Sequence, residues 1–309
     1  MNFDILKITL SQMLVMFFFV IMGYFFGKKK LSKSIANGLS FIQINLFMPL
    51  MVLNSVSTNL TRTNAVEKGS FFLISVPLVA CVIVAAKIIS RLITKERMRK
   101  NMLIYSLAFT NFGYLGYPVI RYVFGEEMLS NFIIFAMPFT LLLYSYGQSL
   151  FDKSEKMPFR KKLVRPVTVA LVVGAFLGLC EIPLPKAVTT VFSMGADCVG
   201  PNAMLMTGIV ISSCKLSEIF KRKSSYIISF IKLVVMPVLF TGILYLLGIR
   251  GVPLLCAATI TALPTGMNVI VFSEANGLDS TEAAGHCLIA SLFSIITIPL
   301  LFAVITAIM

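Results

Sequence analysis

Residues 5–26 read ILKITLSQMLVMFFFVIMGYFF, and residues 27–30, which follow directly, read GKKK. A helix needs about 20 mostly apolar residues to span the hydrocarbon core of a bilayer, and this run supplies them. A secretory signal peptide carries its positive charge before a shorter apolar core and has a small-residue cleavage site after it. Here the charge follows a longer core, so residues 5–26 are expected to form a retained membrane helix.

The rest of the chain has the same character. Its 309 residues are 58% hydrophobic and only 13% charged, whereas soluble domains carry about 25% charged residues. The ten apolar runs are residues 5–26, 35–56, 70–92, 101–122, 129–151, 164–180, 187–213, 225–247, 252–274 and 281–308. Because lipid offers the backbone no hydrogen bonds, each run is expected to be a helix. The predicted fold class is an all-α integral membrane protein with ten transmembrane helices.

The basic residues indicate how these helices are oriented. Of 27 lysines and arginines, twenty lie in or beside the loops after the first, third, fifth and seventh runs, and six lie on the opposite side. The basic side of a membrane protein faces the cytoplasm. We therefore expect a multi-pass protein of the cytoplasmic membrane with both termini extracytoplasmic. The net charge of +14 then reflects topology and contact with anionic lipid headgroups, and no nucleic acid partner is expected.

Several classes of function lack their characteristic residues. The six cysteines are scattered through apolar runs without a C-x-x-C pair, and His286 is the only histidine, so no histidine metal cluster is possible. The sequence contains no H-E-x-x-H, G-x-S-x-G or P-loop motif. We expect neither an enzyme nor an ATP-driven pump, and no cofactor beyond a coupling ion.

Prolines suggest an internal repeat. Ten helices with both ends outside divide into two halves of five that enter from opposite sides, which is a common transporter design. Three prolines recur in order at offsets of 146 to 160 residues: Pro49, Pro77 and Pro118 against Pro201, Pro237 and Pro264. The predicted repeats are residues 1–152 and 163–309. The alternative is that these prolines merely kink separate membrane helices.

Two segments combine proline, glycine and an amide in the middle of a run. Residues 111–118 read NFGYLGYP and residues 262–268 read ALPTGMN. Proline removes a backbone N–H, and glycine tolerates the dihedral angles of an unwound stretch. Interrupted helices at matching positions of two halves indicate a transporter's binding site, where the N-termini of half-helices suit a carboxylate. The predicted substrate site comprises Asn111, Gly113, Gly116, Pro118, Pro264, Thr265 and Asn268. The alternative is a pair of kinked packing helices.

Three further polar residues lie inside apolar runs. Asp197 precedes a proline by four residues, as Asn45 does in the second run. A carboxylate at this depth is costly and indicates function, so we expect Asp197 to bind a coupling ion, H⁺ or Na⁺, or to contact the substrate. The alternative is that it pairs with a lysine or a backbone group. Asn45 is expected to face the substrate site. Lys232 is expected to extend to the interface, the alternative being a pair with an anion or with Asp197.

These motifs resemble those of a known family. Residues 111–118 resemble the N-x-G-x-L-G-x-P signature of the auxin efflux carrier family, which includes plant PIN-type carriers and bacterial malate-type permeases. Residues 263–268 with 271–274 resemble that family's second crossover segment. Residues 232–237 resemble its basic residue and proline in helix 8, and residues 45–49 its helix 2 motif. The resemblance covers the whole chain in order.

The resemblance implies a fold related to bile-acid symporters and sodium/proton antiporters. Helices 4 and 9 would be broken and cross at Pro118 and Pro264. Helices 1, 2, 6 and 7 would form a scaffold, helices 3–5 and 8–10 would move as an elevator, and the protein would be a homodimer. The short connection at residues 152–163 lacks the long loop of plant carriers, which favours a bacterial-type permease.

The predicted function is secondary active transport of a small organic anion, a carboxylate such as malate, across the cytoplasmic membrane. One alternative is an efflux carrier for auxin-like aromatic carboxylates. Another is a channel or a ligand receptor on the same fold, whose flux would neither saturate nor couple to a second ion. The substrate, the direction of transport and the coupling ion do not follow from the residues.

Overall fold

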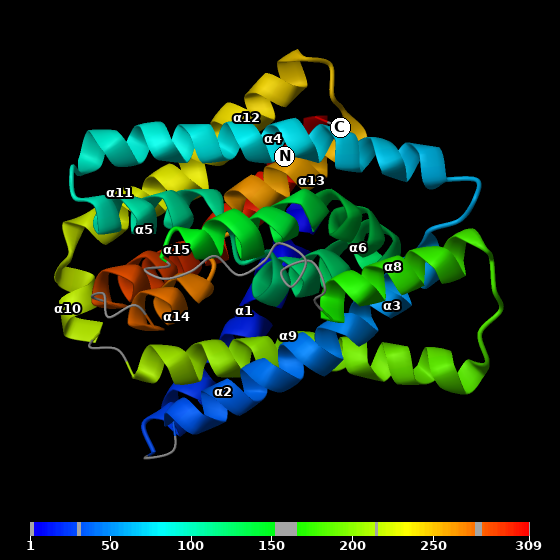
Figure 1. The fold of residues 1–309 in the computed structure, drawn as a ribbon, viewed down its shortest axis with the longest axis horizontal. Coiled ribbons are helices and arrows are strands. Elements are labelled where there is room, and N and C mark those ends of the chain that lie inside the picture. The colour runs from blue at the N-terminus through cyan, green and yellow to red at the C-terminus, as the bar shows by residue number, and fades with distance from the viewer. Residues whose placement is uncertain (1–2, 30–31, 152–165, 214–215, 276–279, 309) are drawn as a thin grey trace.

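The computed structural model describes residues 3–29, 32–151, 166–213, 216–275 and 280–308. Within these ranges the regular structure is helical, apart from one isolated β-bridge (Figure 1). The α-helices are α1 (Phe3–Gly27), α2 (Ser32–Ile42), α3 (Met48–Asn59), α4 (Ala65–Ile93), α5 (Arg97–Ala108), α6 (Tyr117–Leu142), α8 (Pro166–Leu179), α9 (Lys186–Ser212), α10 (Leu216–Lys221), α11 (Lys223–Phe230), α12 (Met236–Leu246), α13 (Gly251–Ala262), α14 (Asn268–Ala275) and α15 (Ser280–Ile308). The expected boundary between the repeats, at residues 152 to 163, lies outside the described residues.

Seven helical stretches in the described ranges are long and apolar enough to cross a membrane. Two shorter apolar helices, α8 and α13, accompany them. Large apolar side chains stay exposed on the outer faces of α1, α4, α8 and α12, for example Phe18, Leu73, Phe176 and Val238. Such faces are stable against lipid and unstable against water. The protein is therefore a multi-pass membrane protein.

The number of long helices is smaller than ten for a physical reason. After α5 the backbone becomes extended at Phe109 (φ −108°, ψ 122°) and turns helical again only at Phe112. After α13 it becomes extended at Leu263 (φ −62°, ψ 144°), the residue before Pro264, and α14 begins at Asn268. A residue before proline is pushed out of the helical region by the proline ring. In addition, residues 112–147 count as one apolar stretch of 36 residues, although Gly125 (φ 87°, ψ −177°) is non-helical and divides it into two helical parts.

In the part of the chain that the structure describes, three of the four π-helical turns lie just before prolines. The turns η1 (Gln43–Phe47), η2 (Phe112–Gly116) and η4 (Ile231–Val235) each end two residues before a proline, at Pro49, Pro118 and Pro237. In each case the residue just before the proline donates its N–H to the carbonyl five residues earlier. Proline lacks an N–H and its ring crowds the preceding turn. The wider turn relieves this crowding while keeping the neighbouring backbone bonded.

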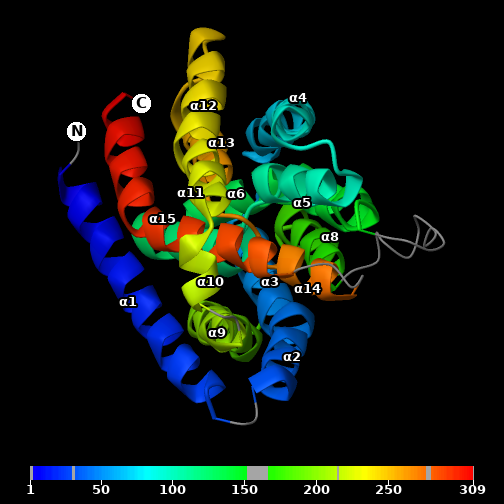
Figure 2. The same cartoon turned by 90° about the vertical axis from the view of Figure 1, so that its left-hand side faces the viewer.

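The helices pack in two groups. The first consists of α1, α2, α3, α8 and α9, in which α1 packs along α9 and α3 packs on both α8 and α9. The second consists of α4, α5, α6 and α11 to α15, in which α4 packs on α5 and α6, and α12 packs on α13. Figure 2 shows α1, α2 and α9 on the outer left and lower sides, and α4, α11 and α12 above. The groups meet where α1 contacts α15 and α3 contacts α6.

Glycines allow the closest of these contacts. A Cβ atom built on Gly208 of α9 would lie 1.9 Å from the Val20 carbonyl oxygen of α1, and one on Gly23 of α1 would lie 2.0 Å from the Leu205 carbonyl oxygen. No side chain fits in these positions. Small residues let two backbones approach and gain dispersion contacts, which drive helix association in lipid, where no hydrophobic effect is available. The α1–α9 contact is therefore made of backbone against backbone.

Candidate functional site

The two helix interruptions meet inside the molecule. Thr110 and Thr265 form an antiparallel β-bridge. The Asn111 N–H donates to the Pro264 carbonyl at 2.8 Å, and the Gly266 N–H donates to the Phe109 carbonyl at 3.1 Å. Extended backbone at membrane depth must find partners within the protein. Here each interruption supplies the partners that the other needs, so segments about 155 residues apart in the chain fix one another's geometry.

Side chains complete the bonding at the end of α5. The Leu107 carbonyl would normally accept from the Asn111 N–H, which instead bonds Pro264. The Lys232 side chain is fully buried, and its Nζ atom donates to this carbonyl at 2.8 Å. The expectation that Lys232 extends to the interface is therefore wrong. The carbonyl end of α5 carries partial negative charge, which stabilises a cation there.

The Thr265 hydroxyl satisfies a second carbonyl in the same turn. It donates to the Ser106 carbonyl at 2.9 Å and is buried. Thr265 was expected to line a substrate site. The structure places its side chain against α5, and its role there is to hold the two interruptions together.

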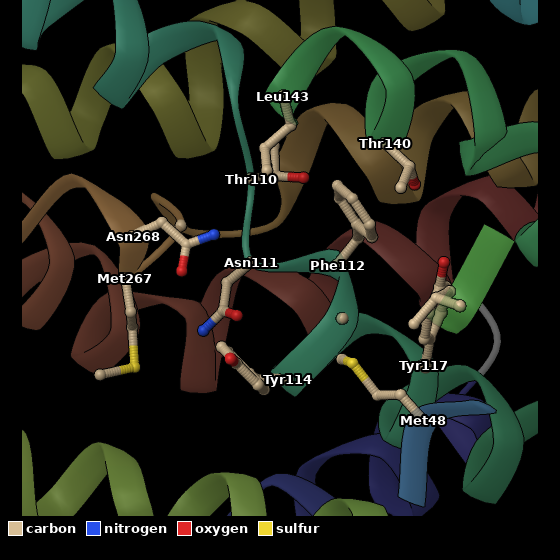
Figure 3. Close-up of a pocket in the computed structure, with 13 residues that line it drawn as sticks. Met48, Thr110, Asn111, Phe112, Tyr114, Tyr117, Thr140, Leu143, Met267 and Asn268 are labelled. Carbon is tan, nitrogen blue, oxygen red and sulfur yellow. The ribbon is translucent and has the colours of Figure 1, made fainter. Parts of the chain in front are cut away.

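A cavity lies beside the bridge. Its volume is about 50 Å³, which is room for a few water molecules. Its lining residues are Met48, Thr110, Asn111, Phe112, Gly113, Tyr114, Tyr117, Thr140, Leu143, Val167, Gly266, Met267 and Asn268 (Figure 3). Met48 and Val167 belong to the first group of helices. The other lining residues lie in the two interruptions, in the helices α6 and α14 of the second group, or in the π-helical turns that continue into or out of α6. The cavity therefore lies at the boundary between the two groups.

The lining of this cavity is uncharged and includes two amide side chains. The Asn111 and Asn268 amides come from different interruptions and both line it. Asn111 is buried and Asn268 is half-buried. The first residues of η2, Phe112 and Gly113, and the first residue of α14 also line it. Helix N-termini present free N–H groups and partial positive charge. The lining contains no charged side chain, so an anion would be bound by N–H and hydroxyl donors without a cationic partner.

The remaining residues of the predicted crossover segments shape the cavity from outside its lining. Gly116 lies where a Cβ atom would come 2.6 Å from the Leu263 Cδ1 atom. Pro118 sits in the first turn of α6 and approaches Gly200 of α9. Pro264 contributes its carbonyl to the bridge. Asn111, Gly113 and Asn268 are the predicted residues that line the cavity.

Asn45 and Asp197 lie elsewhere. Asn45 is exposed and donates its amide to the Phe41 carbonyl of its own helix at 2.8 Å. Asp197 is 64% exposed and accepts from Arg121 at 2.8 Å, while Arg121 also pairs with Glu126 at 2.5 Å. Neither Asn45 nor Asp197 lines the cavity.

The buried polar contact between η1 and α9 involves other residues. The Gln43 side chain is fully buried and donates to the Val199 carbonyl at 3.1 Å. It also accepts from the Asn202 amide at 2.7 Å. Asn45 stands out in the sequence through its spacing to a proline, whereas the only sequence signal for Gln43 and Asn202 is that each is an amide within an apolar run.

Sequence comparison relates the chain to membrane transport proteins. A family described as membrane transport protein matches residues 8–158 and residues 149–302. An uncharacterized transporter of Methanothermobacter thermautotrophicus is 28% identical over 199 residues, which are 62% of this chain and 64% of that protein, slightly less than two thirds of its length. An uncharacterized transporter of Methanocaldococcus jannaschii is 25% identical over 310 residues, which are 95% of this chain and 97% of that protein.

Proposed function

Because the chain belongs to the membrane transport protein family, that of the auxin efflux carriers, we propose that it is a secondary transporter for a small organic anion. The resemblance drawn from residues 111–118 is thereby confirmed. The family is one of transporters and is generally non-enzymatic. The observation that carries the proposal is the uncharged cavity where two amides and two helix N-termini converge.

A carboxylate suits this cavity chemically. The residues at the start of η2 and α14, with backbone N–H groups and the Asn111 and Asn268 amides, line the cavity, and such donors would suit an anion. Charge-assisted hydrogen bonds of this kind are about twice as strong as neutral ones. The small volume favours a compact acid such as malate. An auxin-like aromatic acid would require the rings of Tyr114 and Tyr117 to move away from the cavity.

The proposed architecture is ten spans arranged as a 5+5 inverted repeat. The interruptions at 109–111 and 263–267 fall within the expected fourth and ninth spans and bond to each other, which supports two broken crossover helices. The packing of α1, α2, α3, α8 and α9 as one group supports a scaffold of helices 1, 2, 6 and 7. A cavity at the boundary between the groups would reach either side of the membrane if the second group slid as an elevator.

The proposal includes the setting of the protein. The basic loops would face the cytoplasm, both termini would lie outside, and the protein would reside in the cytoplasmic membrane as a homodimer. Transport would be driven by a proton or sodium gradient. Because Asp197 pairs with Arg121 at an exposed position, we assign the coupling ion to a different group below.

Counterflow in proteoliposomes tests the proposal. Vesicles loaded with unlabelled malate, or with other mono- and dicarboxylates, should take up the labelled acid in a saturable manner. Asn268→Ala and Asn111→Ala should each lower uptake about tenfold or more, because removing one charge-assisted hydrogen bond costs about 1.5–3 kcal/mol. Asn45→Ala removes the same amide from an exposed position and should leave uptake unchanged. Flux that never saturates would instead indicate a channel.

Folding must be measured alongside transport. Size-exclusion elution and thermal unfolding of each variant should match the unsubstituted protein, since the amides line a cavity and support no packed core. If folded Asn268→Ala and Asn111→Ala proteins transport normally, the cavity is not the substrate site. If Asn45→Ala protein loses uptake, the substrate path includes η1 as the sequence suggested.

A further inference from the structure

One buried titratable group has no role in the cavity. His286 of α15 is the chain's single histidine and is fully buried. Its Nδ1 atom lies 3.0 Å from the Ser106 hydroxyl, whereas its Nε2 atom has no hydrogen-bond partner. An orphaned polar atom in a buried site is costly and calls for an explanation. With Nδ1–H donating to Ser106, Nε2 carries a free lone pair that can accept a proton.

A carboxylate lies next to that lone pair. The Glu282 Oε1 atom is 4.0 Å from His286 Nε2, one helical turn away on the same helix. Arg99 of α5 holds Glu282 through both carboxylate oxygens, at 2.8 Å and 3.1 Å, and Ser224 donates to it at 3.2 Å. Arg99 is 36% exposed and Glu282 10%. Glu282 therefore lies between the His286 imidazole and water at the basic side of the molecule.

Apart from Glu282, the charged groups that act on the His286 imidazole are cationic. They are Arg99 and Arg222, which lies between α10 and α11. Lys232 of η4 binds the Leu107 carbonyl, one residue beyond Ser106. Helix α13, which also packs on α15, offers only the buried Cys256 thiol as a titratable group. Glu282 is thus the one anionic partner of the site among the described groups that act on the imidazole.

On its other side the imidazole touches the crossing point. Ser106, which bonds His286 through its hydroxyl, bonds Thr265 through its carbonyl. Thr265 forms the β-bridge with Thr110, which lines the cavity. A chain of hydrogen bonds and one bridge therefore runs from His286 to the cavity wall, and Glu282 lies 4.0 Å from the other side of the imidazole. Coupling between sites requires such a physical connection between elements.

We propose that His286, poised between Glu282 and Ser106, is the site that binds the coupling proton of this transporter. The proposal rests on the proposed function and names its coupling ion. A proton from water at the basic side would pass by Glu282 and bind the Nε2 lone pair. The imidazolium would then pair with Glu282, loosening the Arg99 contact, while Nδ1–H keeps its bond to Ser106. The charge of the site rises by one and no covalent bond other than N–H forms.

The groups present favour a proton over a metal cation. The described residues contain no cluster of three or more histidine, cysteine, aspartate or glutamate side chains that could hold a metal. Hard cations take several oxygen ligands, but both Glu282 oxygens are already engaged by Arg99. A free imidazole lone pair suits a proton.

A single histidine can be observed directly. Protein carrying ¹⁵N-labelled histidine and a histidine-free affinity tag gives imidazole signals from His286 alone, whose shifts report protonation and tautomer. Arg99→Gln should free Glu282 for the imidazole and raise the pH midpoint of its titration by about one unit, whereas Glu282→Gln should lower it. An imidazole that stays neutral down to pH 4.5 in the Arg99→Gln protein would overturn the proposal.

Transport provides the second arm. Malate counterflow needs no net proton movement, so His286→Gln should retain it. The stimulation of malate uptake by an imposed pH gradient should be at least fivefold smaller in this variant than in the unsubstituted protein. Ser294→Ala, a buried substitution two turns along α15, is the matched control and should keep that stimulation. Equal stimulation of His286→Gln and unsubstituted protein would refute the proton site and leave the proposed function intact. Absent counterflow with a His286 titration as described would refute malate transport and leave the proton site intact.

Discussion

At the scale of single residues, the structure depends on a few side chains that replace missing helix bonds. The clearest is Thr265, whose hydroxyl satisfies the Ser106 carbonyl at the broken end of α5. Thr265→Val keeps the shape and removes the bond. It should destabilise the protein by about 1–3 kcal/mol, the cost of an unsatisfied buried acceptor, and should lower uptake. Thermal unfolding and counterflow measure the two effects, and Thr265→Ser should restore both.

A matched control exists one helix earlier. Thr259 is equally buried and donates to the Leu255 carbonyl inside α13. The Leu255 carbonyl lies in the middle of α13. The backbone hydrogen bonds of this helix continue to its end, where the Leu263 N–H donates to the Thr259 carbonyl. Thr259→Val should therefore change stability by only a few tenths of a kcal/mol. If both variants lose stability equally, the Thr265 hydroxyl has no special place at the crossing.

Residue types predicted part of the site, and geometry decided the rest. Asn111 and Asn268 were identified because amides beside proline and glycine interrupt two apolar runs, and both line the cavity. Asn45 lies four residues before Pro49, the spacing that Asp197 has to Pro201, but it is exposed and bonds the Phe41 carbonyl of its own helix. The expectation that Lys232 extends to the membrane interface rests on hydropathy, which shows only that a charged residue lies among apolar neighbours. It does not show that a distant helix ends with a free carbonyl beside it.

At the scale of helices, most positions followed from hydropathy and most irregularities from proline. The run expected at 101–122 begins at Arg97 in the structure, because the first turn of α5 is basic and apolar counting passes over it. The interruptions at 109–111 and 263–267 were expected from their prolines and glycines. The π-helical turns before Pro49, Pro118 and Pro237 are not expected from the sequence. They compensate for the hydrogen bond that proline cannot donate, and the form of that compensation depends on the surrounding helix.

The α1–α9 contact gives a prediction at this scale. Gly208→Ala places a Cβ atom against the Val20 carbonyl, and only separation of two backbones could relieve the clash. Overpacking of this kind costs about 1–3 kcal/mol or more. The yield of monodisperse protein and its unfolding temperature should both fall. Gly242→Ala on α12, where nothing lies within 4 Å, should be tolerated, and an equal loss there would show that the effect is not a packing effect.

At the scale of the whole molecule, one ion pair bridges the two groups of helices. Arg121 of α6 belongs to the second group and Asp197 of α9 to the first, and their contact is 2.8 Å. Any sliding of one group past the other would have to break it. Exposed pairs are worth about 0–1 kcal/mol in water. The pair would therefore favour the observed arrangement slightly without locking it.

Removing the pair should speed exchange between arrangements. Asp197→Asn keeps the shape of the side chain and removes its charge, and 1 kcal/mol corresponds to about fivefold in a rate. Counterflow should accordingly rise up to about fivefold if breaking the pair limits the rate, with little change in unfolding temperature. Glu127→Gln removes an exposed carboxylate from α6, the helix that carries Arg121, and should leave counterflow unchanged. Loss of transport in folded Asp197→Asn protein would contradict this interpretation, because it would mean that Asp197 takes part in ion coupling and that the pair with Arg121 is only its resting state.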